Sequence, residues 1–340
     1  MDLGSVRKIA RERLQGYCRV CPVCDGRVCA GEVPGMGGVG TGSSFKANVE
    51  ALRRCRFNMR TIHRVKAVDT SFELWGKEIS IPVLAAPMTG TSYNFGGGMT
   101  DEEFSEEIAA GCLQAGTLAM TGDGADPAMY RSGLKAIVSH EGKGIPIIKP
   151  REQEEIIRKI RLAEDTGAMA VGMDIDGAGL ITMALKGQPV GPKTIEEIRE
   201  VVAATRLPFV LKGIMTPEEA DMAVEAGVAA IVVSNHGGRV LDYTPGAADV
   251  LPGIAGRVKG KLTIFADGGV RTGADALKLL ALGADAVLVG RPLVTGAFGG
   301  GREGVALILD KMRNELVQAM LLTGTADVKR VNSDILYRGI

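Results

Sequence analysis

From residue 81 onward, the chain alternates short apolar runs with longer stretches that mix apolar and charged residues. The runs are almost continuously apolar, which is typical of strands buried on both faces of a parallel sheet. They lie at residues 81–87, 117–121, 145–149, 170–175, 208–212, 229–234, 262–267 and 285–290.

The stretches between these runs have the features of amphipathic helices. They carry acidic residues near their beginning and end at glycine, as the helix dipole and C-terminal capping favour. The clearest are residues 100–116, 151–167, 216–227 and 272–283. Eight strand–helix units predict an α/β fold of the (β/α)8 TIM barrel type, and a doubly wound open sheet is the weaker alternative.

Residues 1–80 do not follow this repeat. Their pattern predicts an N-terminal helix, a cysteine-rich loop, a second helix around residues 45–57 and a short strand pair near residues 70–79. This segment has too little apolar sequence for an independent core. We therefore divide the chain into an N-terminal extension, residues 1–80, that caps the barrel or covers its mouth, and a barrel domain, residues 81–340.

Composition narrows the range of partners. Forty basic residues balance forty acidic ones, so no overall field attracts nucleic acid or an anionic membrane. No stretch approaches the roughly 20 apolar residues of a membrane span, and the first residues lack the apolar core of a secretory signal. We expect a cytoplasmic protein with neither nucleic acid nor membrane as a partner.

Four of the six cysteines, Cys18, Cys21, Cys24 and Cys29, follow the spacing C-x2-C-x2-C-x4-C. Without a secretory signal, a disulfide framework is less expected. The spacing permits either an iron–sulfur cluster or zinc, and its three-cysteine start favours iron–sulfur. Buried or reducible free thiols in a glycine-rich loop are the interpretation slightly favoured over a metal site.

Polar residues follow the predicted strands at one common end. In a TIM barrel the active site lies at the carboxyl ends of the strands, so these side chains are expected to meet at one rim. Taken singly, each could be an ordinary solvated or turn residue, and it is the shared register that favours a site. The residues are Pro87, Met88, Thr121, Lys149, Asp174, Asp176, Lys212, Ser234, His236, Asp267, Gly268, Gly269, Gly290 and Arg291.

The stretch "SNHGGR", residues 234–239, holds His236, one of only three histidines in the chain. Two glycines separate it from Arg239, and they leave the backbone free to turn tightly or to approach a ligand. We take His236 and Arg239 as candidate catalytic residues.

The loops after the last two strands predict a phosphate site. "FADGGVRTGAD" and "LVGRPLVTG" place glycines at helix beginnings, where free backbone N–H groups bind anions. Arg271 and Arg291 can add charge-assisted hydrogen bonds. A phosphorylated ligand or cofactor is therefore expected.

The stretches "LKGI", "VVSNHGGRVLDYTP", "ADGGVRTGADALKLLALGADAVLVGRP" and "LVQAMLLTGTADVKRV" resemble the FMN-dependent α-hydroxy-acid oxidase and dehydrogenase family. This family includes glycolate oxidase, lactate oxidase and flavocytochrome-type lactate dehydrogenase. The resemblance implies a barrel with FMN at its mouth that oxidises a lactate-like 2-hydroxy acid to the 2-oxo acid. It also implies a homo-oligomeric enzyme with hydride transfer to flavin N5, or removal of the α-proton by the base in a carbanion version.

The resemblance also implies roles for individual residues. His236 is the general base, Asp176 orients it, and Arg239 binds the substrate carboxylate. Lys212 lies beside the flavin ring, where a positive charge favours the reduced form. The implied FMN contacts are Ala86, Pro87, Met88, Thr121, Lys149, Asp174, Lys212, Ser234, Asp267, Gly268, Gly269, Arg271, Gly290 and Arg291.

The chain departs from the family on the substrate side. The stretch "GMGGVGTGSS" lacks the expected tyrosine, and "DIDGAGLITMALKG" lacks a second arginine. Lys149 and Tyr93 are the candidates to replace them. The identity of the hydroxy acid and the electron acceptor, whether oxygen, a protein or another molecule, is left open.

Three alternative functions share parts of this pattern. A flavin-dependent isomerase of the type 2 isopentenyl diphosphate isomerase kind has a similar barrel but does not need the His236–Arg239 pair. An inosine-monophosphate dehydrogenase needs a loop cysteine, which the barrel loops lack. A flavin electron-relay or regulatory protein would use the N-terminal cysteines as its metal cluster.

Overall fold

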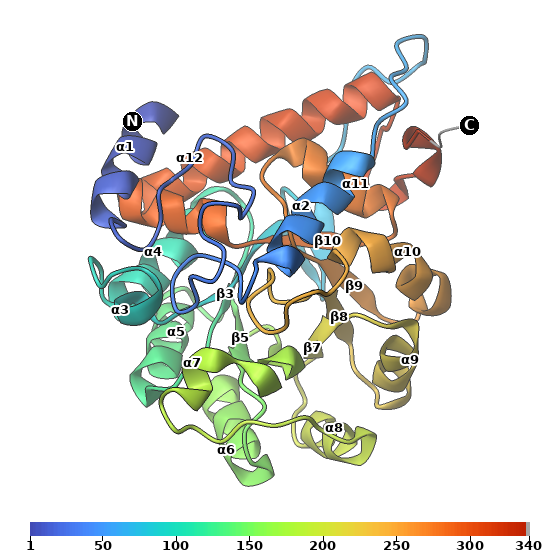
Figure 1. Cartoon of the computed structure of the whole chain (residues 1–340). Coiled ribbons are helices and arrows are strands. Elements are labelled where there is room, and N and C mark those ends of the chain that lie inside the picture. Colours follow the sequence, from blue (N-terminus) through green and yellow to red (C-terminus); the bar gives the residue numbers. More distant parts are fainter. Residues whose placement is uncertain (338–340) are drawn as a thin grey trace.

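Eight parallel strands form a closed barrel in the computed structural model, which describes residues 1–337 (Figure 1). Their order around the barrel is β10-β3-β4-β5-β6-β7-β8-β9, so neighbours in sequence are neighbours in space. Each predicted apolar run overlaps one strand, which confirms the (β/α)8 barrel over the open sheet. The strands are β3 (Val83–Met88), β4 (Ala119–Thr121), β5 (Ile145–Ile148), β6 (Val171–Asp174), β7 (Phe209–Ile214), β8 (Ala230–Val233), β9 (Thr263–Ala266) and β10 (Ala286–Val289).

Helices surround the barrel, and several begin at a capping box. The Thr100, Thr194 and Thr272 side chains each accept a hydrogen bond from the third helical residue, whose carboxylate binds back. The outer helices are α4 (Asp101–Gln114), α5 (Pro127–Ser139), α6 (Gln153–Glu164), α8 (Ile195–Ala203), α9 (Pro217–Glu225), α10 (Ala247–Val258), α11 (Gly273–Ala281) and α12 (Arg291–Thr323). Shorter helical segments are α3 (Thr91–Asn94), η1 (Ile175–Gly179), α7 (Ile181–Ala184), η2 (Val328–Arg330) and η3 (Ser333–Ile335).

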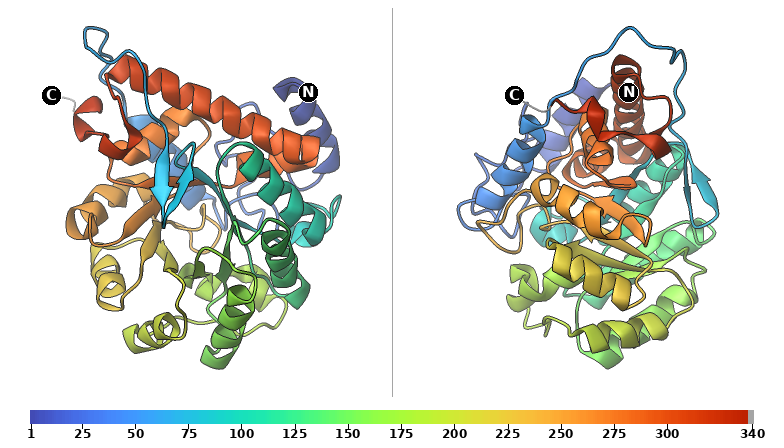
Figure 2. Two further views of the ribbon diagram at one scale, coloured as in Figure 1. Left: turned by 180° about the vertical axis from the view of Figure 1, so that it is seen from behind. Right: turned by 90° about the vertical axis from the view of Figure 1, so that its right-hand side faces the viewer.

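A hairpin of β1 (Phe72–Leu74) and β2 (Lys77–Ile79) closes the amino-terminal end of the barrel. Leu74 and Ile79 are buried in the same apolar cluster as the side chains that fill the barrel interior. The Trp75 ring packs edge-on against Phe265, with 6.4 Å between ring centroids. Seen from behind in Figure 2, the hairpin lies across this end, so the active-site end is the opposite one.

The cysteine loop and α2 (Ser43–Arg54) lie over the opposite end, the barrel mouth (Figure 1). Helix α1 (Leu3–Arg13) packs against α12, and α2 lies beside the loops that follow β8 and β9. The predicted first helix, second helix and strand pair are thus all present. No helix within residues 1–337 has the length and apolar character needed to cross a membrane.

Candidate active site

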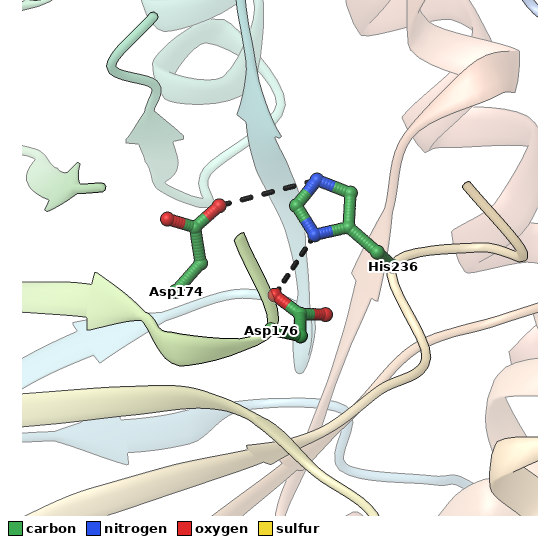
Figure 3. A group of neighbouring side chains, drawn as sticks. All are labelled: Asp174, Asp176 and His236. Carbon is green, nitrogen blue, oxygen red and sulfur yellow. Dashed lines mark hydrogen bonds and ion pairs between the residues drawn. The ribbon is translucent and has the colours of Figure 1, made fainter. Parts of the chain in front are cut away.

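His236 lies in the loop after β8, where its side chain meets two carboxylates, Asp174 at the end of β6 and Asp176 just after it (Figure 3). Its Nδ1 atom is 2.9 Å from Asp176 Oδ1, and its Nε2 atom is 3.9 Å from Asp174 Oδ2. Because an ionised carboxylate only accepts hydrogen bonds, we assign the imidazole proton to Nδ1. The Nε2 lone pair is then free to accept a proton.

The pKa values of this pair suit a general base. Burial lowers the pKa of His236 below its ordinary value, although the Asp176 charge partly opposes this. Burial alone would raise the pKa of Asp176, but His236 and Lys212 outweigh it and bring the value to about 2. At neutral pH, the site therefore holds a neutral imidazole fixed by an ionised carboxylate.

Two lysines complete a buried charge network. Lys212 Nζ is 3.6 Å from Asp176 Oδ2, and Lys149 Nζ is 2.5 Å from Asp174 Oδ2. Burial lowers the pKa of Lys212, but the nearby carboxylates, Asp176 first, outweigh it and raise the value. The ligand atoms of Asp174, Asp176 and His236 lie within 4.8 Å of one another. Since both carboxylates already pair with ammonium groups, this trio is a charge network and not a metal site.

Arg239 reaches across the mouth from the same loop as His236. It donates a hydrogen bond to Asn94 Oδ1 at 2.8 Å and another to the Gly35 carbonyl. Burial lowers its pKa to about 10, so the guanidinium stays charged at neutral pH. Tyr93 lines the same cavity, and burial raises the pKa of its phenol to about 12. Tyr93 and Arg239 thus line the same cavity, whereas the Lys149 ammonium is paired with Asp174.

The loops after β9 and β10 form a cationic cradle. Gly268 and Gly269 have φ values of +89° and +83°, which L side chains rarely adopt. Arg291 packs on the Phe45 ring, 3.9 Å from its centroid, and burial lowers its pKa to about 9. The Nε atom of Arg271 is buried without a hydrogen-bond partner in the described chain. Such a cradle suits a phosphate group.

One cavity joins most of the predicted residues. Tyr93, Asn94 and Asp123 also line it. The predicted residues that line it are Ala86, Pro87, Met88, Lys149, Lys212, His236, Arg239, Asp267, Gly268, Gly269, Arg271, Gly290 and Arg291. Four others are not among its lining residues: Thr121, Asp174 and Ser234, which are buried, and Asp176, whose side chain is 9% exposed. Ser234 holds the backbone of His236, because its Oγ accepts from the His236 N–H at 3.0 Å.

Asp123 is a site residue that the sequence pattern did not single out. Its carboxylate is buried and accepts hydrogen bonds from the Lys149 N–H at 3.0 Å and from Arg151 Nε at 3.2 Å. Lys159 Nζ lies 3.2 Å from the other oxygen. The signal that could have found it is its place two residues beyond Thr121, just after a predicted strand. Asp123 thereby fixes the end of β5 from which Lys149 enters the site.

The four clustered cysteines lie outside this cavity but line a second one beside it. Within the described residues, no three of their sulfur atoms lie within 4.8 Å of one another. A metal site at these cysteines therefore stays a prediction.

A closed barrel with a histidine–carboxylate pair and an anion cradle at one rim defines a TIM-barrel enzyme that uses a phosphorylated cofactor. The sequence matches the model of the family described as FMN-dependent dehydrogenase, over residues 35–184 and 181–338. The chain belongs to this FMN-dependent dehydrogenase family, and it is an FMN-dependent oxidoreductase.

Individual relatives agree with this assignment. The chain is 31% identical to 2-hydroxyacid oxidase 2 of Bos taurus, over 85% of this chain and 88% of that protein. It is 30% identical to an L-lactate dehydrogenase of Xanthomonas campestris, over 89% of this chain and 91% of that protein. A mandelate oxidase variant with (S)-mandelic acid superposes with a TM-score of 0.80 at 28% identity, covering 99% of this chain and 98% of that one. A flavocytochrome b2 variant superposes with a TM-score of 0.77 at 28% identity, covering 88% of this chain and 80% of that one.

The residues present fit FMN. Asp267 Oδ1 and Arg271 Nε belong to residues that line the cavity, and both are buried polar atoms that lack hydrogen-bond partners within the described chain. Buried polar atoms are normally satisfied, so these indicate a polar ligand. The cradle of Gly268, Gly269 and Arg291 suits the cofactor phosphate, and Lys212 suits the electron-accepting part of the ring.

Proposed function

We propose that this protein oxidises a 2-hydroxy acid of the lactate type to the corresponding 2-oxo acid. The observation that carries the proposal is the convergence of a neutral His236, its Asp176 partner and Arg239 on one buried cavity. The relatives named above act on 2-hydroxy acids, which supports this substrate class. They do not favour the isomerase or the relay-only alternatives.

Each side chain has a definite part in the proposed reaction. Arg239 pairs with the substrate carboxylate and presents the α-hydroxyl to His236. His236 Nε2 removes the hydroxyl proton, and Asp176 stabilises the imidazolium that results. Bound FMN supplies the two-electron acceptor for the α-hydrogen. Lys212, buried and positively charged, favours negative charge developing beside it.

We further propose that Tyr93 completes the recognition of the substrate carboxylate. Its hydroxyl is 3.3 Å from Met129 Sδ, a weak acceptor that a carboxylate can readily replace. Met36 and Leu180 also line the cavity and offer apolar surface to the substrate side chain. An apolar side chain, as in lactate or a longer hydroxy acid, suits this environment better than a charged one.

The substitution His236→Asn tests the base. Asparagine tolerates the left-handed backbone of His236, whose φ is +58°, so the loop can keep its shape. We expect anaerobic flavin bleaching by L-lactate, glycolate or a longer 2-hydroxy acid in the native protein. In the variant, the bleaching rate should fall by a factor of about 10² to 10⁴ while FMN stays bound. A native flavin that stays unbleached with every hydroxy acid would refute the proposed function.

The substitution Arg239→Lys tests carboxylate binding. Lysine keeps the charge but loses the planar pair of donors, so we expect KM to rise by a factor of about 10 to 100, with a smaller effect on kcat. Steady-state kinetics with the best substrate measures both constants. The matched control is Arg257→Lys, a half-exposed arginine that pairs with Asp221 on the surface. An unchanged KM in Arg239→Lys would exclude this residue as the carboxylate anchor.

A further inference from the structure

The four clustered cysteines line one cavity of about 490 Å³ beneath the N-terminal extension. All four thiols are half-buried, so none is a surface thiol facing open solvent. The cavity wall also carries several cationic side chains. These are Arg7, Arg19, Arg53, Arg271, Arg291 and Lys311.

The backbone of the cysteine loop is held in place by α1. Arg7 Nη2 donates to the Val20 carbonyl at 3.2 Å and to the Cys21 carbonyl at 2.7 Å. Arg11 Nη2 adds a hydrogen bond to the Val20 carbonyl at 3.2 Å. The Val20 N–H in turn lies 3.4 Å from Cys18 Sγ. Backbone hydrogen bonds to cysteine sulfur are among the features that tune iron–sulfur clusters.

The spacing of the sulfur atoms separates the two kinds of metal site. Four thiolates around one zinc ion, at Zn–S distances of about 2.3 Å in a tetrahedron, stand about 3.8 Å apart. No three of these cysteine sulfurs gather within 4.8 Å among the residues the structure describes. A four-iron cube holds each thiolate on a different iron and therefore keeps the sulfurs further apart. A zinc-like spacing is thus not preformed at the described cysteines, and a four-iron group does not need it.

The cysteine cavity and the flavin cavity share a wall. Met36, Gly269, Arg271 and Arg291 line both. The contact is direct at Arg271, whose Nη2 is 3.4 Å from Cys24 Sγ while its loop belongs to the phosphate cradle. A redox group among the cysteines would thus lie one side chain away from the cofactor.

We propose that Cys18, Cys21, Cys24 and Cys29 bind a [4Fe–4S] cluster that carries electrons from the reduced flavin to a one-electron acceptor protein. The electron route rests on the proposed function. One hydroxy acid gives up two electrons and two protons, and two acceptor molecules each take one electron through the cluster. The protons pass to water. Val23 and Val28, which lie between the cysteines, are 59% and 58% exposed, so an acceptor can approach the cluster.

Metal analysis of the holoenzyme, purified without oxygen, tests the cluster. We expect about four iron and four acid-labile sulfide per chain, with an electron paramagnetic resonance signal after dithionite reduction. Cys21→Ser and Cys24→Ser should lose iron and signal but retain FMN. The matched control is Cys55→Ser, a half-buried thiol outside the loop, which should keep both. Because the native holoenzyme is assayed directly, stoichiometric zinc, a disulfide or metal-free thiols there would overturn the proposal even if the variants fail to fold.

Reduction by substrate under nitrogen tests the electron route. With L-lactate or a longer 2-hydroxy acid, we expect the cluster signal to appear as the flavin bleaches. In Cys21→Ser, the flavin should bleach without any cluster signal. A bleached flavin beside a cluster that stays oxidised would overturn the relay. If no hydroxy acid reduces either the flavin or the cluster, while dithionite reduces the cluster, the metal site stands and the proposed function is refuted instead.

Discussion

The reactivity of His236 depends on a balance between burial and one carboxylate. Burial lowers the pKa of the imidazole, while Asp176 raises it and fixes the Nδ1 proton. The loop backbone contributes as well, because His236 has a φ of +58° and turns its ring back over the barrel mouth. A neutral base that can accept a proton with little change in geometry follows from these three conditions.

Replacing Asp176 by asparagine should change both rate and pH dependence. The base acts when neutral, so kcat/KM rises with pH through the His236 pKa and then levels off. Removing the Asp176 charge lowers the pKa of His236 further, which moves this rise to lower pH. At the same time, the plateau should fall by a factor of about 10² to 10⁴, because the imidazolium loses its partner.

The measurement is a pH profile of kcat/KM for both forms, with Asp310→Asn, at a half-exposed carboxylate that pairs with Arg313, as the control. A lower plateau with an unmoved rise would point to a structural role only.

The polar residues at strand ends were predictable from the sequence because the barrel places all such ends at one rim. The Lys149–Asp174 ion pair and the position of Tyr93 were not, since both depend on contacts across the cavity.

At the scale of elements, α2 and the loop after β8 hold each other in place. Helix α2 follows Gly42, which offers no capping side chain, and Asp242 from the β8–α10 loop accepts the Ser43 N–H at 2.9 Å instead. Asn48 in α2 donates to Asn235 Oδ1 at 2.7 Å, directly before His236. The extension thus positions the catalytic loop.

At Gly238, the loop after β8 approaches α2 so closely that no side chain fits between them. The φ of Gly238 is +78°, and an added Cβ would lie 2.4 Å from the Phe45 nitrogen in α2. We expect Gly238→Ala to lower the free energy of unfolding by about 1–3 kcal/mol more than Gly260→Ala does. Gly260 has a similar φ of +82° but open space around its Cα, so the comparison isolates the clash. Urea denaturation measures both, and equal losses would disprove the close contact.

The strands were predictable because a short, continuous apolar run between turn residues, repeated eight times, is typical of buried parallel strands. The hairpin of β1 and β2 was also predicted as a strand pair. Its place at the bottom of the barrel was not, because only Leu74, Ile79 and the Trp75–Phe265 contact reveal what it covers. Packing partners far apart in sequence leave no local pattern.

At the scale of the molecule, the N-terminal extension closes both ends of the barrel. The hairpin fills the amino-terminal end, while α2 and the cysteine loop cover the mouth (Figures 1 and 2). Stability and chemistry are therefore divided between opposite ends of one core. A substitution at the hairpin should therefore lower the stability of the protein without changing its catalytic activity.

Leu74→Ala tests this separation. Leu74 is 1% exposed in the barrel cluster, so we expect a loss of about 2–5 kcal/mol in the free energy of unfolding. At a temperature where the variant is folded, kcat/KM should stay within a factor of about 2, a change of about 0.4 kcal/mol. Leu322→Ala, at a side chain 41% exposed, is the control with a smaller stability loss. A large fall in kcat/KM for folded Leu74→Ala would contradict the separation.

The carbonyls of Met36 and Gly37 receive hydrogen bonds from Arg291, which lies 255 and 254 residues later in the chain. During synthesis from the N-terminus, the extension therefore leaves the ribosome long before its partners exist. The mouth cannot assemble until β10 and the start of α12 have been made. FMN can accordingly bind only after nearly the whole chain has been synthesised. Chains that end before β10 should carry no bound FMN.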